Sequence, residues 1–209
     1  MLEPFGLYVI LTNPVAGYER CAEAAVAEGV PFLQLRMKGS PPGEVLATAR
    51  RLRSITRGSA TRLIVNDDVD IAAACDADGV HLGQDDLPII QARHRWPVPG
   101  KLFGLSTHSE AQELAARERS PDYVGVGPLF PTPTKARPDP LLGLDRAAAI
   151  VRASPLPAVA IGGIDAANLA SVLARGISNV AVVRAVCARD DPRSAIAELR
   201  AVWRAARRP

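Results

Sequence analysis

Short apolar segments rich in Val, Ile and Leu recur along the chain and predict β-strands. Each is apolar at nearly every position and lacks the alternation of a strand with one face in water. Such runs are typical of strands that are covered on both faces. We predict eight of them, at residues 7–11, 32–36, 62–66, 79–82, 102–106, 123–127, 158–163 and 180–184.

Segments with helical composition separate these strands. They cover residues 21–29, 42–58, 108–119, 144–154, 165–176 and 192–207, and the segment after residue 82 leaves room for one irregular helix. Ser109 is a candidate N-cap with Gln112 three residues on, and Asp165 and Gly176 begin and end another segment. A polar residue before a helix and a glycine after it are common boundary signals.

Eight apolar strands alternating with helices predict an α/β protein with a (β/α)8 TIM-barrel fold. The alternative is a doubly wound open sheet, but no G-x-G-x-x-G motif follows the first strand. Composition does not shift along the chain as it would at a linker. We therefore expect a single barrel domain over residues 1–209.

The charge balance excludes some classes of partner. The chain has 25 basic and 22 acidic residues, and the basic ones are scattered except near the C-terminus, which argues against nucleic acid. No segment approaches the roughly 20 apolar residues of a membrane span. Cys21, Cys75 and Cys187 match no metal or redox spacing. We expect a cytoplasmic protein; a homo-oligomer is left open.

In a (β/α)8 barrel, chemistry collects at the carboxyl ends of the strands. Asp67 and Asp86 follow two consecutive strands and offer hard oxygen ligands, which suit Mg²⁺ better than zinc. Arg36, Ser106 and Lys135 are candidates for binding the phosphates of a substrate. Gly162-Gly163 and Val183-Arg184, which end the last two strands, resemble the phosphate site that barrels build there.

Each of these motifs also has a plain structural interpretation. An aspartate after a strand is commonly a turn former or a helix cap. The loop 131–135 is stiffened by proline whether or not it binds anything, and two glycines serve a tight turn. His81, within an apolar strand, is interpreted as a hydrogen-bonded core histidine, and His108 as a residue at a helix start. The functional interpretation depends on all candidates meeting at one end of one fold.

Six ordered motifs resemble the thiamine phosphate synthase family. They are QLRMK, NDDVDIAAACDADGVHLGQDDL, GLSTHS, DYVGVGPLFPTPTK, AIGGI and VAVVRAV, and they extend from the second predicted strand to the eighth. The resemblance implies a (β/α)8 barrel. It also implies a transferase that couples a hydroxymethylpyrimidine diphosphate with a thiazole phosphate, giving thiamine phosphate and pyrophosphate. Pyrophosphate would leave first, and the thiazole nitrogen would attack the resulting pyrimidine carbocation.

The resemblance also implies roles for individual residues. Asp67 and Asp86 correspond to the Mg²⁺ ligands, and Gln34 is placed to contact the pyrimidine. The implied diphosphate contacts are Arg36, Lys38, Asn66, Ser106 and Lys135, of which Arg36, Lys38, Ser106 and Lys135 would be catalytic. Thr132, Thr134, Gly163, Val183 and Arg184 would form the pocket for the thiazole phosphate.

The chain departs from the family pattern at two positions. Arg184 stands where serine is frequent, which concerns phosphate affinity more than activity, and Met37 replaces a frequent acidic residue. Two alternatives remain: a thiazole tautomerase of the same fold, which lacks the acidic metal-diphosphate set, and a non-catalytic protein that binds a thiamine precursor. Whether the thiazole partner carries a carboxylate is also open.

Overall fold

A computed structural model of the protein describes residues 4–134 and 139–206. Eight parallel strands pair in sequence order and close into a barrel, with β1 joined to β8. The strands are β1 Gly6–Leu11, β2 Phe32–Leu35, β3 Arg62–Asn66, β4 Gly79–Leu82, β5 Leu102–Thr107, β6 Tyr123–Val126, β7 Ala158–Ile161 and β8 Asn179–Val182. Closure confirms the predicted (β/α)8 fold and rejects the open sheet.

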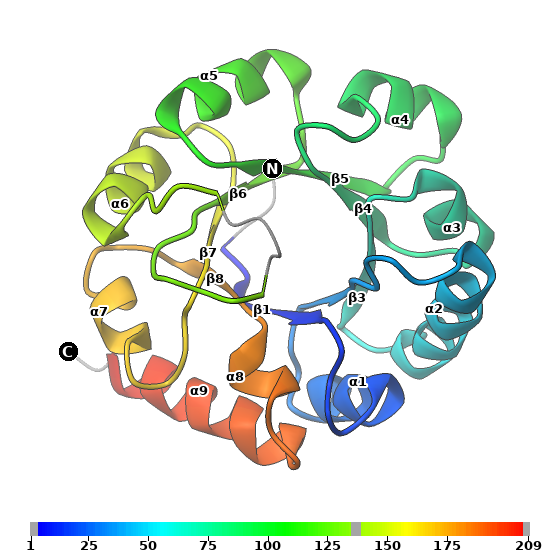
Figure 1. Ribbon diagram of the computed structural model, residues 1–209, viewed down its shortest axis with the longest axis horizontal. Helices are drawn as coiled ribbons and strands as arrows, with labels where there is room; N and C mark the ends of the chain where they lie inside the picture. The colour runs from blue at the N-terminus through cyan, green and yellow to red at the C-terminus, as the bar shows by residue number, and fades with distance from the viewer. Residues whose placement is uncertain (1–3, 135–138, 207–209) are drawn as a thin grey trace.

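Helices form a ring around the barrel (Figure 1). They are α1 Tyr18–Ala27, α2 Pro42–Thr56, α3 Val69–Ala74, α4 Ile89–Arg95, α5 Glu110–Arg119, α6 Leu144–Ala153, α7 Leu169–Leu173, α8 Arg184–Cys187 and α9 Pro192–Ala206. The predicted N-cap of α5 is confirmed, because Ser109 Oγ accepts a hydrogen bond from the Gln112 N–H at 3.2 Å.

Several predicted boundaries were wrong. β2 ends at Leu35 rather than Arg36, and Arg184 begins α8 instead of ending β8. β7 ends at Ile161, because Gly162 and Gly163 have φ angles of 107° and 65° that no strand continues. Asp165 precedes α7 without starting it; its carboxylate accepts the N–H groups of Ala167 and Asn168 in a turn.

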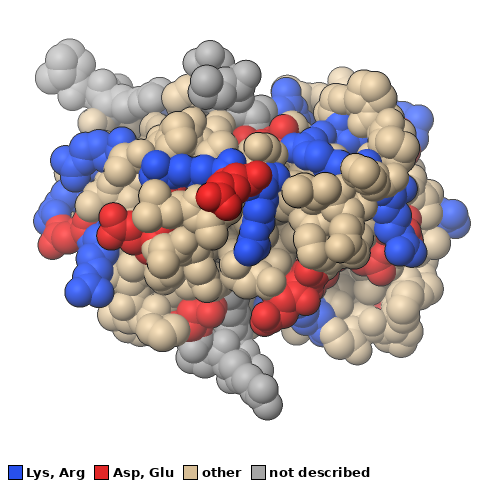
Figure 2. All heavy atoms as spheres, turned by 90° about the horizontal axis from the view of Figure 1, so that it is seen from above, with Lys and Arg blue, Asp and Glu red and all other residues tan. Residues whose placement is uncertain are grey.

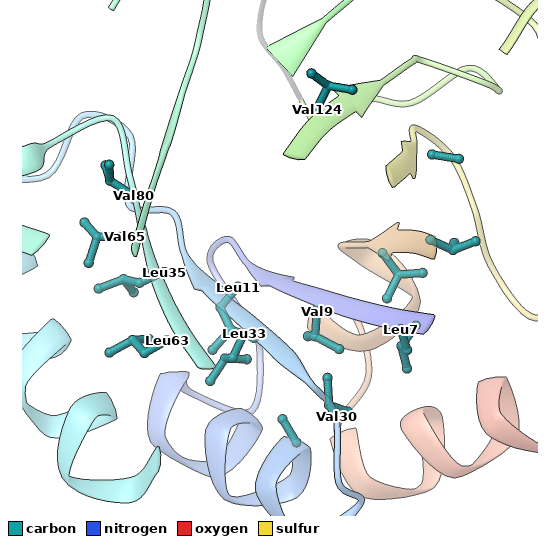
Figure 3. Close-up of a cluster of buried hydrophobic side chains, with 14 of the residues drawn as sticks. Leu7, Val9, Leu11, Val30, Leu33, Leu35, Leu63, Val65, Val80 and Val124 are labelled. Atoms are coloured by element: carbon teal, nitrogen blue, oxygen red, sulfur yellow. The ribbon is translucent and has the colours of Figure 1, made fainter. Parts of the chain in front are cut away.

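Strand residues alternate between two apolar layers. Leu7, Val9 and Leu11 belong to the large cluster between the barrel and its helices, whereas Tyr8 and Ile10 belong to a smaller cluster inside the barrel. Figure 3 shows part of the outer layer, with aliphatic side chains of β1, β2 and β3 above the helices. Successive strand residues therefore do alternate between the two sides of the sheet, but both sides are apolar and covered.

Aromatic rings fill the interior near the amino-terminal end of the barrel. Phe32 lies with its ring centroid 4.2 Å from Phe5, 5.4 Å from Tyr8 and 6.1 Å from Tyr123. Rings in tilted and edge-on contact at these distances attract one another as well as excluding water. This end of the barrel is thus closed.

Carboxylates at the same end join the strands to their neighbours. Asp78 Oδ2 accepts the N–H of Leu63 at 2.7 Å and bonds Arg53 at 3.0 Å. Two strands further round the barrel, Asp122 Oδ2 repeats the arrangement, with the N–H of Phe103 at 2.7 Å and Arg93 at 2.9 Å. These bonds satisfy backbone groups where strand pairing begins.

Charged residues of both signs are interspersed on the face of the molecule shown in Figure 2. No helix in residues 4–134 or 139–206 has the length and apolar character that crossing a membrane requires.

Candidate active site

A cavity of about 450 Å³ opens at the carboxyl ends of the strands. Its floor consists of strand residues that face the barrel interior: Ile10, Gln34, His81, Ser106, Gly125, Ile161 and Ala181. Its walls come from the loops after β6, β7 and β8. The cavity lies opposite the closed aromatic end, where a barrel places its chemistry.

Most of the site residues predicted from sequence line this one cavity. They are Gln34, Arg36, Asn66, Ser106, Thr132, Thr134, Gly163, Val183 and Arg184. Lys38, Asp67 and Asp86 are not among its lining residues, although Asp67 directly follows Asn66. Lys135 lies outside the described residues. The structure therefore brings the described members of the predicted set to one end of the fold, with the acidic pair beside the cavity.

Asp67 and Asp86 come from the loops that follow the adjacent strands β3 and β4. Burial raises the pKa of Asp67, and the neighbouring carboxyl of Asp86 raises this pKa further, whereas Lys38 lowers it. Lys38 Nζ lies 2.5 Å from Asp67 Oδ2, and Asp86 Oδ2 accepts the N–H of Gly83 at 2.6 Å. A carboxyl whose pKa is raised by a neighbouring carboxyl is well suited to share a cation with it.

Two carboxylates suit magnesium better than a metal whose ligands are all protein side chains. Within the described ranges no three His, Cys, Asp or Glu side chains come together as metal ligands. Mg²⁺ commonly binds one or two carboxylates and takes its remaining oxygens from water and substrate phosphates. The donor set of Asp67 and Asp86 satisfies that requirement, and zinc would need His or Cys.

Arg36 supplies positive charge inside the cavity. Burial lowers the pKa of Arg36 and Asp67 raises it, but a guanidinium remains protonated in proteins. A partly desolvated cation is stabilised by an anion that enters the same dry space. Arg36 is therefore suited to bind a phosphate or diphosphate.

The loops after β6 and β7 pack backbone against backbone at the cavity wall. The N–H groups of Leu129 and Phe130 donate to the carbonyls of Ile161 and Gly162 at 3.0 Å each. A Cβ on Gly163 would lie 2.7 Å from the carbonyl oxygen of Pro131. Beyond this contact, the hydroxyls of Thr132 and Thr134 lie 3.0 Å apart. The two loops together place the threonines at the cavity.

His81 and His108 contribute more than the sequence indicated. His81 is hydrogen-bonded within the barrel as predicted, to Ser106 at 2.9 Å and Tyr123 at 3.2 Å, but it also lines the cavity floor. His108 lines the cavity, donates through Nδ1 to the Gly127 carbonyl at 2.8 Å, and lies 3.4 Å from Asp139. For His81 the overlooked signal was register, since a polar residue between the outward-facing Val80 and Leu82 must face the interior.

Comparisons with known proteins agree with this geometry. A family model described as "Thiamine monophosphate synthase" matches residues 7–186. The chain belongs to the thiamine monophosphate synthase family.

Individual relatives show the same similarity. A thiamine-phosphate synthase of Anaeromyxobacter dehalogenans is 42% identical over 204 residues, covering 97% of this chain and 89% of that protein. One of Gloeobacter violaceus is 45% identical over 89% of this chain, which spans only about half (54%) of that longer relative. The solved structure of a thiamine phosphate pyrophosphorylase from Pyrococcus furiosus has a TM-score of 0.88 and 34% identity, covering 98% of each chain.

In this member of the thiamine monophosphate synthase family, Arg184 is exposed at the first position of α8 while still lining the cavity. Arg189 adds a second guanidinium to the same wall and lies 3.3 Å from Glu198. The wall formed by the loop after β8 is therefore cationic. That charge complements a phosphate on this side of the cavity.

The contact between the two wall loops can be tested with a pair of glycine substitutions. Gly163 and Gly176 have positive φ angles of 65° and 80°, but an added Cβ at Gly176 would meet nothing within 4 Å. We expect Gly176→Ala to lower the free energy of unfolding by about 1 kcal/mol through backbone strain alone. Gly163→Ala should cost about 2 kcal/mol or more, because the clash with Pro131 adds to the strain. Urea denaturation measures both, and equal losses would show that the loops move apart freely.

Proposed function

We propose that this protein is a thiamine phosphate synthase. It joins 4-amino-2-methyl-5-hydroxymethylpyrimidine diphosphate to 4-methyl-5-(2-phosphoethyl)thiazole, or to the carboxylated form of that thiazole. The bond between the pyrimidine methylene carbon and diphosphate oxygen breaks, its electron pair leaves with pyrophosphate, and the thiazole nitrogen bonds the resulting carbocation. The observation that carries the proposal is that one cavity is lined by Gln34, by Arg36, Asn66 and Ser106 of the predicted diphosphate set, and by the five residues predicted for the thiazole phosphate.

The chemistry requires charge stabilisation more than acid-base catalysis. Asp67 and Asp86 would hold Mg²⁺, which when bound neutralises charge on the departing diphosphate. Arg36, Lys38, Ser106 and Lys135 bind and orient the same oxygens, with Asn66 beside them. Preorganised donors of this kind act where charge develops and need no reorganisation as the bond breaks.

The two reactants occupy different parts of the cavity in this proposal. Gln34, on the floor and only 1% exposed, contacts the pyrimidine. The thiazole phosphate is held at the walls formed by the loops after β6, β7 and β8. The residues that hold it are Thr132, Thr134, Gly163, Val183 and Arg184. Holding both reactants in line converts an encounter in solution into a reaction within one complex.

A coupling assay tests the proposal directly. Purified protein is incubated with the pyrimidine diphosphate, the thiazole phosphate and Mg²⁺, and thiamine phosphate is measured by conversion to fluorescent thiochrome. We expect product that requires both substrates. Binding of both without product would favour a protein that senses thiamine precursors. If no product forms, the pyrimidine diphosphate does not bind, and the protein tautomerises the carboxylated thiazole, the tautomerase alternative would be favoured.

The metal assignment predicts a large effect at Asp67. Asp67→Ala removes one of the two adjacent carboxylates, so turnover should fall by about 10²-fold or more while the protein remains folded. Asp85→Ala is the matched control, because Asp85 is an exposed carboxylate in the loop that carries Asp86. Excess EDTA should abolish activity of the unmodified enzyme. Near-normal turnover of Asp67→Ala, or full activity in EDTA, would contradict the assignment.

Lys135 is expected to act on the departing pyrophosphate. Lys135→Ala removes a positive charge from this step, so kcat should fall by about 10²-fold. Lys101→Ala provides the comparison, since Lys101 Nζ is 2.8 Å from Asp76 in the described structure and lines no part of the cavity. Single-turnover rates of both variants decide the matter. An unchanged rate for Lys135→Ala would leave this lysine as a solvated loop residue.

A further inference from the structure

Five side chains form a chain of hydrogen bonds across the barrel interior, at and below the cavity floor. Gln34 Nε2 donates to the Tyr8 hydroxyl at 2.7 Å, and Tyr8 lies 3.0 Å from the Tyr123 hydroxyl. Tyr123 lies 3.2 Å from His81 Nδ1, and His81 Nε2 lies 2.9 Å from Ser106 Oγ. The chain joins β2, β1, β6, β4 and β5, and both of its ends line the cavity.

The middle of this chain has no access to water. Tyr8 is 1% exposed and Tyr123 is fully buried. Burial raises the pKa of both phenols far above the ordinary value, so both stay neutral at physiological pH. Each neutral phenol has one hydrogen to donate, and a buried phenol without a partner would be costly.

Because each phenol can donate only one hydrogen, the chain of hydrogen bonds has a direction. Because Gln34 donates to Tyr8, the Tyr8 hydrogen must go to Tyr123, and the Tyr123 hydrogen to His81 Nδ1. His81 then carries its hydrogen on Nε2 and donates to Ser106. At one end Gln34 keeps its carbonyl oxygen for the cavity, and at the other Ser106 keeps its hydroxyl hydrogen.

The backbone reserves space for the central contact. A Cβ on Gly104 would lie 2.3 Å from Tyr123 Cζ and 2.5 Å from His81 Nδ1. Any side chain at position 104 would therefore push the phenol and the imidazole apart. The two rings lie with their centroids 5.5 Å apart and their planes 27° from parallel.

We propose that Tyr8, Tyr123 and His81 are positioning residues that fix the hydrogen-bonding direction of Gln34 and Ser106. They act through these two residues on the substrate that the proposed function assigns to the site, and the inference rests on that function for its substrate. Gln34 presents an acceptor to the pyrimidine, and Ser106 presents a donor to the diphosphate.

This arrangement determines which pyrimidine substituent is accepted. A carbonyl oxygen on Gln34 attracts an amino group and repels an oxo group at the same position of the ring. Free rotation of the amide would let Gln34 offer its N–H₂ instead, and the oxo compound would then bind as well. The chain opposes this rotation, because a turned amide would have to accept from Tyr8. Every hydrogen bond as far as Ser106 would then reverse, and the His81 hydrogen would move to Nδ1.

The first experiment needs no substrate. The sequence contains three histidines, so ¹⁵N-histidine labelling gives few imidazole signals, and His81→Gln assigns the one of interest. In the unmodified protein we expect His81 to be neutral with its hydrogen on Nε2. Tyr123→Phe should remove this preference while keeping the ring in place. A hydrogen on Nδ1, or a tautomer that Tyr123→Phe leaves unchanged, would overturn the inference.

The second experiment measures selectivity. We compare kcat/KM for the 4-aminopyrimidine diphosphate with that for its 4-oxo analogue. Tyr123→Phe and Tyr8→Phe should each lower this ratio about tenfold, the loss expected for one buried hydrogen bond. Tyr18→Phe is the matched control, because the half-buried Tyr18 lies outside the cavity and its hydroxyl bonds Asn13. Thermal unfolding of each variant separates loss of fold from loss of selectivity.

A double-mutant comparison tests whether the two ends are joined. Tyr123→Phe cuts the chain between its ends, so adding Ser106→Ala should cost less than Ser106→Ala does in the unmodified enzyme. Tyr8→Phe interrupts the same chain, so there too the combined loss of kcat should be smaller than the product of the two single losses. Independent effects in both pairs would overturn the inference.

The outcomes distinguish the two proposals. An absence of product from the unmodified protein, with the His81 tautomer as expected, would reject the proposed function and leave the hydrogen-bond chain standing. Normal turnover, with Tyr123→Phe as selective as Tyr18→Phe, would support the function and reject the positioning role.

Discussion

Closure of the parallel barrel is the constraint on which the rest of the structure depends. Once β1 pairs with β8, every strand residue must face either the helices or the interior. The outward positions are filled by aliphatic residues that bind the helices to the barrel. The inward positions converge from eight strands on one narrow space, so residues far apart in the sequence become neighbours. Gln34, His81 and Ser106 share the cavity floor for this reason.

The interior is divided along the barrel axis. At the amino-terminal end, Phe32 and its aromatic neighbours exclude water, and Asp78 and Asp122 satisfy the backbone where pairing begins. At the other end the strands stop and loops carry the charged groups. Stability and chemistry therefore depend on different residues, which is the usual division in this fold.

Between these ends lies a layer that is both buried and polar. The phenols of Tyr8 and Tyr123 belong to the aromatic cluster by their rings and to the hydrogen-bond chain by their hydroxyls. A buried network in which every member has a partner is rigid, because rotating one group leaves another unsatisfied. A rigid floor beneath the loops allows the fold to hold polar groups in fixed directions without using charge.

The sequence by itself determined the order of strands and helices, the barrel, and the residues that follow each strand. Periodic apolar runs and helix boundary signals are local, so they can be recognised in the sequence. Because the carboxyl ends of parallel strands always share one edge, Asp67, Arg36 and Ser106 could be placed at one end of the barrel in advance. Only the tertiary structure decided which strand residues face inward together. The contacts of His81 with Tyr123 and Ser106 depend on the register across β4, β5 and β6, and on the space left by Gly104. No local pattern encodes such contacts, because they arise from packing between distant segments.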